Sequence, residues 1–152
     1  MYKDKLDIIN HYEASIDWVK RLRELPEERW RTQVDQDKWT IAEIIGHFIP
    51  WDEFVIRQRI PYLFKDAQLP ASPDAELVNQ QAAEESRNRS KDETIDLFIV
   101  NRESLVRSLY DLPDELWTQD LFKRKKKISL IDYFSGLVAH DYHHFRQIQR
   151  VL

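Results

Sequence analysis

The chain has 152 residues, 42% of them hydrophobic, with a formal net charge of −4 and no cysteine. This length and composition predict one packed domain over residues 1–152, and the lack of cysteine excludes disulfides, thiolate zinc sites and cysteine nucleophiles. The mixed charges give no electropositive surface for nucleic acid, and no apolar stretch is long enough to cross a membrane.

The scarcity of turn residues favours an all-α fold. Two glycines and six prolines argue against a turn-rich all-β protein and against the glycine-rich loops that bind nucleotides. Residues 1–5 lack the apolar core of a signal peptide, so we expect a cytoplasmic protein. Any metal ion must be held by His, Asp or Glu side chains.

The first predicted helix covers residues 2–25 and ends before Pro26. It keeps a helical spacing of apolar residues at Leu6, Ile9, Ile16, Val19 and Leu22. His11 stands alone in this helix, and we expect it to lie on the surface or half-buried, without a ligand role. Residues 27–38 are expected to be a polar connection in which Trp30 covers the end of the bundle.

The second predicted helix begins at Thr40, which with Glu43 has the spacing of a capping box. His47 flanks the apolar stripe of this helix, and Pro50 is expected to kink the helix just beyond it. Glu43 lies one turn before His47 and is a candidate general base, although its place in the capping box favours a structural role.

Residues 60–74 contain three prolines and must carry the chain across to the third helix. Within them Tyr62, Leu63 and Phe64 are too apolar for a free linker and are expected to pack on the bundle. The third helix is predicted from residue 74 or 75 to 112, with a break in the polar stretch 84–91. The basic run 123–127 is expected to be a solvated hairpin tip rather than a nucleic-acid site.

The fourth predicted helix follows Ser129 and carries His140 and His144, four residues apart on one face. This spacing lets a helix present two imidazoles to one metal ion, whereas His143 points elsewhere. Asp141 lies in the middle of the apolar stripe, where a carboxylate needs a partner. It either holds an imidazole N–H of a metal ligand or bonds to a Trp, Tyr or Arg of a neighbouring helix.

Two segments of the chain echo one another. The sequence Leu-Pro-Glu-Glu-Arg-Trp at 25–30 recurs as Leu-Pro-Asp-Glu-Leu-Trp at 112–117, and each copy precedes a capped helix. The echo predicts that the second and fourth helices start at the same end of the bundle and run parallel. His47, His140 and His144 would then lie on equivalent elements and could meet.

The segments 39–48, WTIAEIIGHF, and 140–148, HDYHHFRQI, resemble two motifs of the DinB-like superfamily, which includes the YfiT-like metal-dependent hydrolases. The first is similar to "W-S/T-x-x-E-x-x-x-H-L" and the second to "H-x-x-H-H-R-G-Q-I". The resemblance implies a four-helix bundle with a long crossover between the second and third helices. It also implies a divalent ion, nickel or zinc, held by His47, His140 and His144, and a homodimer.

Three neutral histidines leave positions on a metal ion open to water or substrate. We therefore expect a metal-dependent hydrolase of a small molecule or, as some relatives of this fold are, an S-transferase that uses a low-molecular-weight thiol. The alternative is a non-catalytic stress-response or small-molecule-binding protein in which the metal is incidental or structural. Nucleic acid and membranes are not expected as partners.

Overall fold

The computed structural model describes residues 4–63, 69–118 and 128–152. Over these ranges the chain is helical and has no strand, and the prediction of an all-α four-helix bundle is confirmed. The long helices are α1 (Lys5–Arg21), α3 (Ile41–Gln58), α5 (Lys91–Asp111) and α6 (Leu130–Gln149). Between them lie the shorter α2 (Glu27–Trp30) and α4 (Ala75–Asn88) and the 3-10 turns Leu22–Glu24, Ile60–Tyr62 and Asp114–Thr118.

Each long helix starts at a side chain that accepts a hydrogen bond from its first turn. These N-caps are Asp4, Thr40, Ser90 and Ser129. The capping box of Thr40 and Glu43 is present, and Ser129 forms a second one with Asp132. Such caps satisfy backbone N–H groups that have no partner within the helix. The starts of these helices therefore follow from local sequence.

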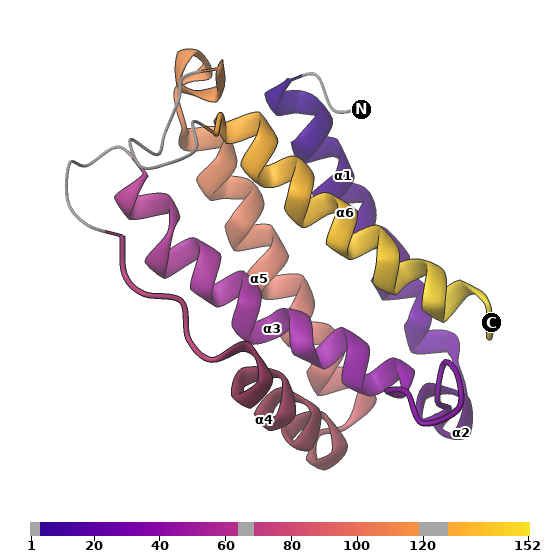
Figure 1. The fold of residues 1–152 in the computed structure, drawn as a ribbon. Coiled ribbons are helices and arrows are strands. Elements are labelled where there is room, and N and C mark those ends of the chain that lie inside the picture. Colours follow the sequence, from indigo (N-terminus) through magenta and orange to yellow (C-terminus); the bar gives the residue numbers. More distant parts are fainter. Residues whose placement is uncertain (1–3, 64–68, 119–127) are drawn as a thin grey trace.

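The long helices form two pairs that run in opposite directions (Figure 1). Helices α1 and α6 run one way and α3 and α5 run the other, as the colour gradient shows. Consistent with this, Lys5 at the start of α1 donates a hydrogen bond to the carbonyl of Leu112, just past the end of α5. Arg102 in the second half of α5 donates a hydrogen bond to Asp52 in the second half of α3, which fits two helices that run in the same direction.

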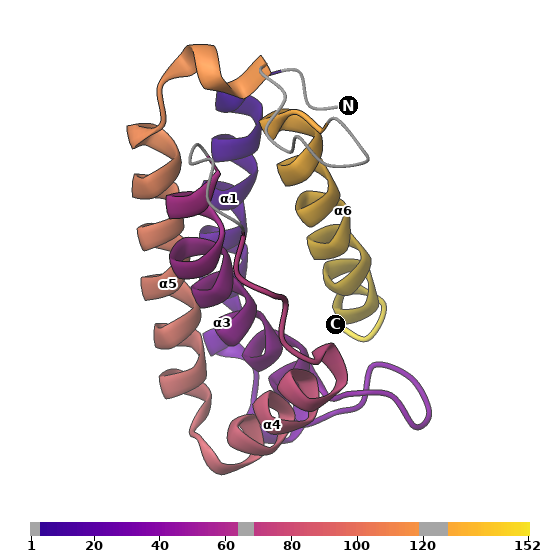
Figure 2. The same ribbon diagram turned by 60° about the vertical axis from the view of Figure 1, so that its left-hand side comes forward.

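The prediction that the second and fourth helices run parallel is therefore wrong, because α3 and α6 are antiparallel. The reason lies in the crossover, which returns the chain to the end where α3 began (Figure 2). Helix α5 starts there and runs beside α3 in the same direction, so α6 must come back the opposite way. The repeated Leu-Pro segments do not encode this return path.

The crossover is held against α3 by Arg59. Its guanidinium lies 4.5 Å from the Phe54 ring and donates hydrogen bonds to the carbonyl of Pro70 and the hydroxyl of Ser72. Leu63 is buried as expected. Phe64 and the basic run 123–127 fall outside the described residues.

The third predicted helix is divided in two, α4 and α5, by Arg89 and Ser90. Its break lies inside the predicted stretch 84–91. The connection 27–38 is less irregular than predicted, since it contains α2, whose Trp30 is fully buried. Pro50 lies inside α3 without ending it. Among the described residues, no helix has the length and apolar character needed to cross a membrane.

Candidate metal centre

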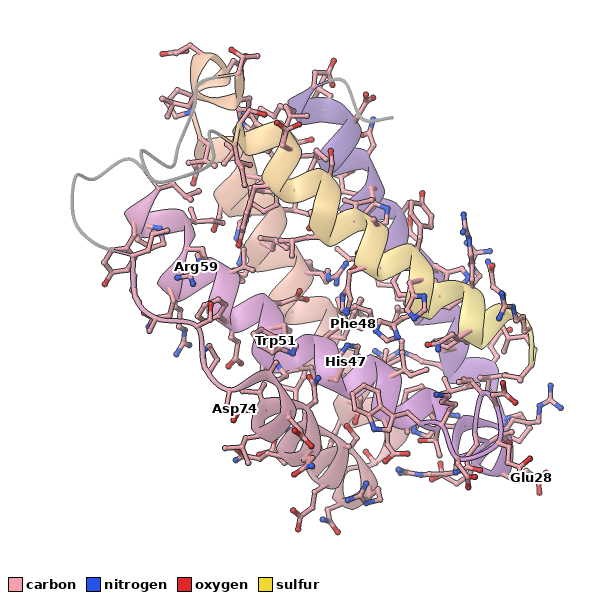
Figure 3. All side chains as sticks on the ribbon, in the orientation of Figure 1. Glu28, His47, Phe48, Trp51, Arg59 and Asp74 are labelled. Carbon is pink, nitrogen blue, oxygen red and sulfur yellow. The ribbon has the colours of Figure 1, made fainter. Side chains whose placement is uncertain are left out.

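Three imidazoles from two helices converge between α3 and α6. His47 on α3 and the pair His140 and His144 on α6 each offer a ring nitrogen, and these three nitrogens lie within 4.8 Å of one another. Figure 3 shows His47 and Phe48 on the part of α3 that faces α6. The structure thus brings together the three histidines that the sequence singled out, while His143 is exposed and outside the group.

Antiparallel packing brings the early turns of α3 opposite the late turns of α6. The Phe48 ring contacts both histidines of α6, with its centroid 5.8 Å from that of His140 and 5.7 Å from that of His144. The centroid of the Trp39 ring lies 4.9 Å from that of the His47 imidazole. The histidines therefore sit among aromatic rings that restrict their orientation.

Hydrogen bonds select the tautomer of two of the imidazoles. His47 Nδ1 bonds to the carbonyl of Ile44, and His144 Nδ1 bonds to Oε1 of Gln147 at 2.9 Å. A carbonyl oxygen only accepts, so each Nδ1 carries the hydrogen and each Nε2 keeps its lone pair. The Nε2 atoms of His140 and His144 are 3.1 Å apart, close to the separation of about 3.3 Å between two nitrogens on one tetrahedral ion.

The site keeps its imidazoles neutral. Burial lowers the pKa of His47 to about 3 and that of His144 to about 4, and it also lowers the pKa of His140. At neutral pH all three rings are therefore unprotonated, the form that binds a metal ion. Converging lone pairs on neutral, oriented rings fit a divalent cation. Three such ligands leave further coordination positions open.

A second polar cluster, which we call the Arg102 cluster, is buried beside the histidines. The Arg102 guanidinium donates two hydrogen bonds to Asp141, at 2.6 and 3.0 Å, and one to Asp52 at 2.8 Å. Nη1 of Arg102 also lies 3.3 Å from Oγ of Ser15. Residues of α1, α3, α5 and α6 all take part, so this cluster ties the four long helices together.

Asp141 is buried, and one of its partners is an arginine of a neighbouring helix, as the second of the two alternatives expected, while the other is His11. Arg102 and the ring Nε2 of His11, at 2.7 Å, both donate to its carboxylate, and neither belongs to the histidine group. Although Asp141 follows His140 directly, its side chain points to α1 and α5 because successive helical residues lie about 100° apart. The carboxylate is thus neutralised by the Arg102 cluster.

His11 is buried, contrary to the expectation of a surface or half-buried residue. No periodicity argument could find the Asp141 carboxylate that accounts for it. Arg102 and Asp52 were missed as well, but a signal existed for both. Each follows a buried phenylalanine by four residues, Phe98 and Phe48 respectively, so each charged side chain falls in an apolar stripe. Charged residues at such positions call for partners of opposite charge.

Both carboxylate oxygens of Glu43 are occupied. Oε1 accepts the backbone N–H of Thr40 at 2.9 Å, and Oε2 accepts from Arg87 at 2.6 Å. These bonds belong to the start of α3 and to its contact with α4. The geometry therefore supports a structural role for Glu43, whose two carboxylate oxygens each accept one hydrogen bond.

Comparisons with known proteins agree with this fold. The family model of the DinB superfamily matches residues 13–148. The structure is similar to YfiT from Bacillus subtilis, described as a probable metal-dependent hydrolase with an unusual four-helix bundle topology. The TM-score is 0.78 at 16% identity, covering 97% of this chain and 85% of that one. A protein from Streptococcus pneumoniae is also similar, with a TM-score of 0.75 at 15% identity, covering 99% of this chain and 91% of that one. No curated protein matches.

Proposed function

The chain belongs to the DinB superfamily, and on that premise we propose that it holds one divalent metal ion at His47, His140 and His144 and hydrolyses a small molecule. The observation that carries the proposal is the convergence of three neutral ring nitrogens from α3 and α6. The description of YfiT as a probable metal-dependent hydrolase supports hydrolysis as the reaction class. Imidazole ligands suit nickel and zinc alike.

The residues of this chain would hold and orient the ion in three ways. The carbonyl of Ile44 and the amide oxygen of Gln147 fix the rings of His47 and His144 with Nε2 toward the ion. His47 is buried on the α3 side, whereas His140 is exposed, so a substrate can approach the ion from solvent past His140. When bound, a divalent ion on neutral ligands keeps its full charge and supplies Lewis acidity to a water or carbonyl oxygen.

The test is metal content, measured by elemental analysis of protein purified without an affinity tag. We expect about one divalent ion per chain in the wild type and loss of the ion in each of His47→Ala, His140→Ala and His144→Ala. His143→Ala is the matched control and should retain the ion, since His143 lies beside His144 yet outside the group. Retention in His140→Ala with loss in His143→Ala would refute the ligand assignment.

The reaction class is tested separately with the metal-loaded and the chelated protein. We expect metal-dependent cleavage of small amides or esters. The panel should include addition of a low-molecular-weight thiol to an electrophile, because the same Lewis acid would polarise a thiol. Turnover of the thiol reaction alone would keep the metal site and replace hydrolysis with S-transfer. The absence of any metal-dependent rate would favour a binding protein.

A further inference from the structure

The two histidines of α6 are in hydrogen-bonding contact with one another. Nε2 of His140 lies 3.1 Å from Nε2 of His144, a distance typical of a hydrogen bond between ring nitrogens. Such a contact between two neutral rings needs one hydrogen between the nitrogens, because two lone pairs that face each other repel. When no ion is bound, one of the two Nε2 atoms must therefore be a donor.

Gln147 determines which of the two nitrogens is the donor. Its amide oxygen lies 2.9 Å from Nδ1 of His144 and can only accept, so the neutral His144 ring carries its single hydrogen on Nδ1. Nε2 of His144 is then the acceptor, and the hydrogen between the rings belongs to Nε2 of His140. The bonds form a chain that runs in one direction, from His140 through His144 to Gln147. Hydrogen bonds in such a chain polarise and strengthen one another.

This tautomer of His140 is not the one that binds an ion through Nε2. The hydrogen must leave Nε2, and the ring stays neutral only if Nδ1 takes up another. His140 is exposed, and no group among the described residues forms a hydrogen bond with its Nδ1. Solvent can therefore remove the first hydrogen and supply the second. His47 needs no such change, because its Nδ1 already donates to the carbonyl of Ile44.

We propose that Gln147 is a positioning residue for both histidines of α6. It holds His144 in the tautomer that binds an ion, and it makes His140 the ligand whose hydrogen moves from Nε2 to Nδ1 when the ion enters. One proton passes from Nε2 to solvent and one returns from solvent to Nδ1, so the His140 ring is neutral before and after. The inference rests on the proposed function and adds the residue that controls how the site accepts its ion.

NMR of ¹⁵N-labelled protein tests the proposal, because long-range spectra distinguish a ring with its hydrogen on Nδ1 from one with its hydrogen on Nε2. The chain has five histidines, so each ring can be assigned by single substitutions. At pH 7.5 the chelator-treated wild type should carry the hydrogen on Nδ1 of His144 and on Nε2 of His140. After addition of zinc, both rings should carry it on Nδ1.

Three substitutions separate the amide oxygen from the bulk of the side chain. Gln147→Leu removes the acceptor, so the His144 hydrogen should divide between Nδ1 and Nε2, and zinc affinity should fall about tenfold or more. Gln147→Glu keeps an acceptor in the same place and should retain both tautomers and bind zinc at least as tightly as the wild type. Gln149→Leu makes the same change at an exposed position of α6 and is the control, which should leave tautomers and affinity unchanged.

A hydrogen on Nδ1 of His140 in the chelator-treated wild type would overturn the proposal and leave the metal site intact. Wild-type tautomers together with wild-type zinc affinity in Gln147→Leu would overturn the role of Gln147. If zinc changes no histidine signal, the metal site is refuted, and the shift at His140 with it. Should Gln147→Leu not fold, Gln147→Glu replaces it, and a hydrogen on Nε2 of His144 in that variant would contradict the inference.

Discussion

Arg102 donates hydrogen bonds to two buried carboxylates, those of Asp52 and Asp141. Its guanidinium lies within about 5 Å of the ring centres of Tyr12, Phe48 and Phe98, and the side chain is almost fully buried. Burial opposes ionisation of Asp141, but Arg102 and His11 outweigh it and lower the pKa of Asp141 to about 2. For Asp52 burial prevails over Arg102 and raises the pKa to about 6. The negative charge of Asp141 therefore stabilises the fold, whereas the negative charge of Asp52 destabilises it.

We predict that Asp141→Asn destabilises the protein at pH 7.5 by about 2–3 kcal/mol, the value of a carboxylate whose pKa is lowered by about two units. Asp52→Asn makes the same chemical change in the same cluster and should cost less than about 1 kcal/mol, because the fold already disfavours the Asp52 charge. Urea denaturation of both variants measures the difference. Equal decreases in the free energy of unfolding would contradict the conclusion that Arg102 stabilises the charge of Asp141 more than that of Asp52.

The raised pKa of Asp52 also predicts a pH dependence. A group whose pKa is higher in the folded than in the unfolded state stabilises the fold below the unfolded value, near 3.8, and loses that contribution as pH rises through about 6. Asp52→Asn lacks this loss. Its stability relative to the wild type should therefore rise between pH 4.5 and pH 7.5, and paired denaturation curves at the two pH values measure it. A difference that stays constant or falls would refute the prediction.

The lowered pKa values of the histidines predict weak proton competition for the metal ion. Three exposed imidazoles with the ordinary pKa near 6.5 would lose about 1,000-fold in affinity between pH 7.5 and 5.5. With pKa values of about 3 for His47 and about 4 for His144, neither ring takes up a proton in this range. The lowered pKa of His140 limits its uptake as well, so the loss should stay below about tenfold. Competition with a chelator of known pH dependence measures the affinity. A loss of 100-fold or more would contradict the lowered pKa values of His47 and His144.

Helix α3 carries most of the local features that shape the site. Its capping box fixes where it starts, and His47 follows within two turns. Gly46, directly before His47, faces α4 so closely that an added Cβ would lie 1.6 Å from Oγ of Ser86. A side chain at position 46 is thus excluded by the neighbouring helix, and α4 backs the turn that presents His47.

The two glycines of the chain form a matched pair for testing this contact. Gly46→Ala should destabilise the protein by about 1–3 kcal/mol through overpacking and should weaken metal binding, since α3 or α4 must shift beside His47. Gly136→Ala in α6 meets no atom within 4 Å and should be neutral or stabilising by up to about 1 kcal/mol, from its better helix propensity. Thermal melts and metal titrations check both. Similar effects of the two substitutions would refute the close packing of α3 and α4.

In the whole molecule, the candidate metal centre joins the two oppositely directed helix pairs. One proposed ligand comes from α3 and two come from α6, so a bound ion would connect segments about a hundred residues apart in the chain. The Arg102 cluster makes a second connection across all four long helices. The candidate metal centre and the Arg102 cluster thus both connect the long helices, so we expect changes in the packing of these helices to affect metal binding as well as stability.

An ion held only by the folded chain should stabilise it by about 2.7 kcal/mol at a free concentration 100 times the Kd. For a chain of this length we expect the Tm to rise by about 5–10 °C on addition of zinc or nickel. The rise should disappear in His144→Ala and persist in His143→Ala. Scanning calorimetry of the apo and loaded forms measures it. A rise of equal size in His144→Ala would show that the ion binds elsewhere.

The sequence by itself predicted the all-α class, the starts of α3 and α6 and the break in the third helix, because capping and apolar spacing act within a few residues of one another. It also singled out His47, His140 and His144, through helical spacing and family motifs. Only the tertiary structure decided the antiparallel course of α3 and α6, which depends on the path of the crossover. It alone assigned His11 and Arg102 to Asp141 and engaged both oxygens of Glu43. These pairings join side chains far apart in the chain, and no local pattern records which distant charges meet when four helices bury their faces.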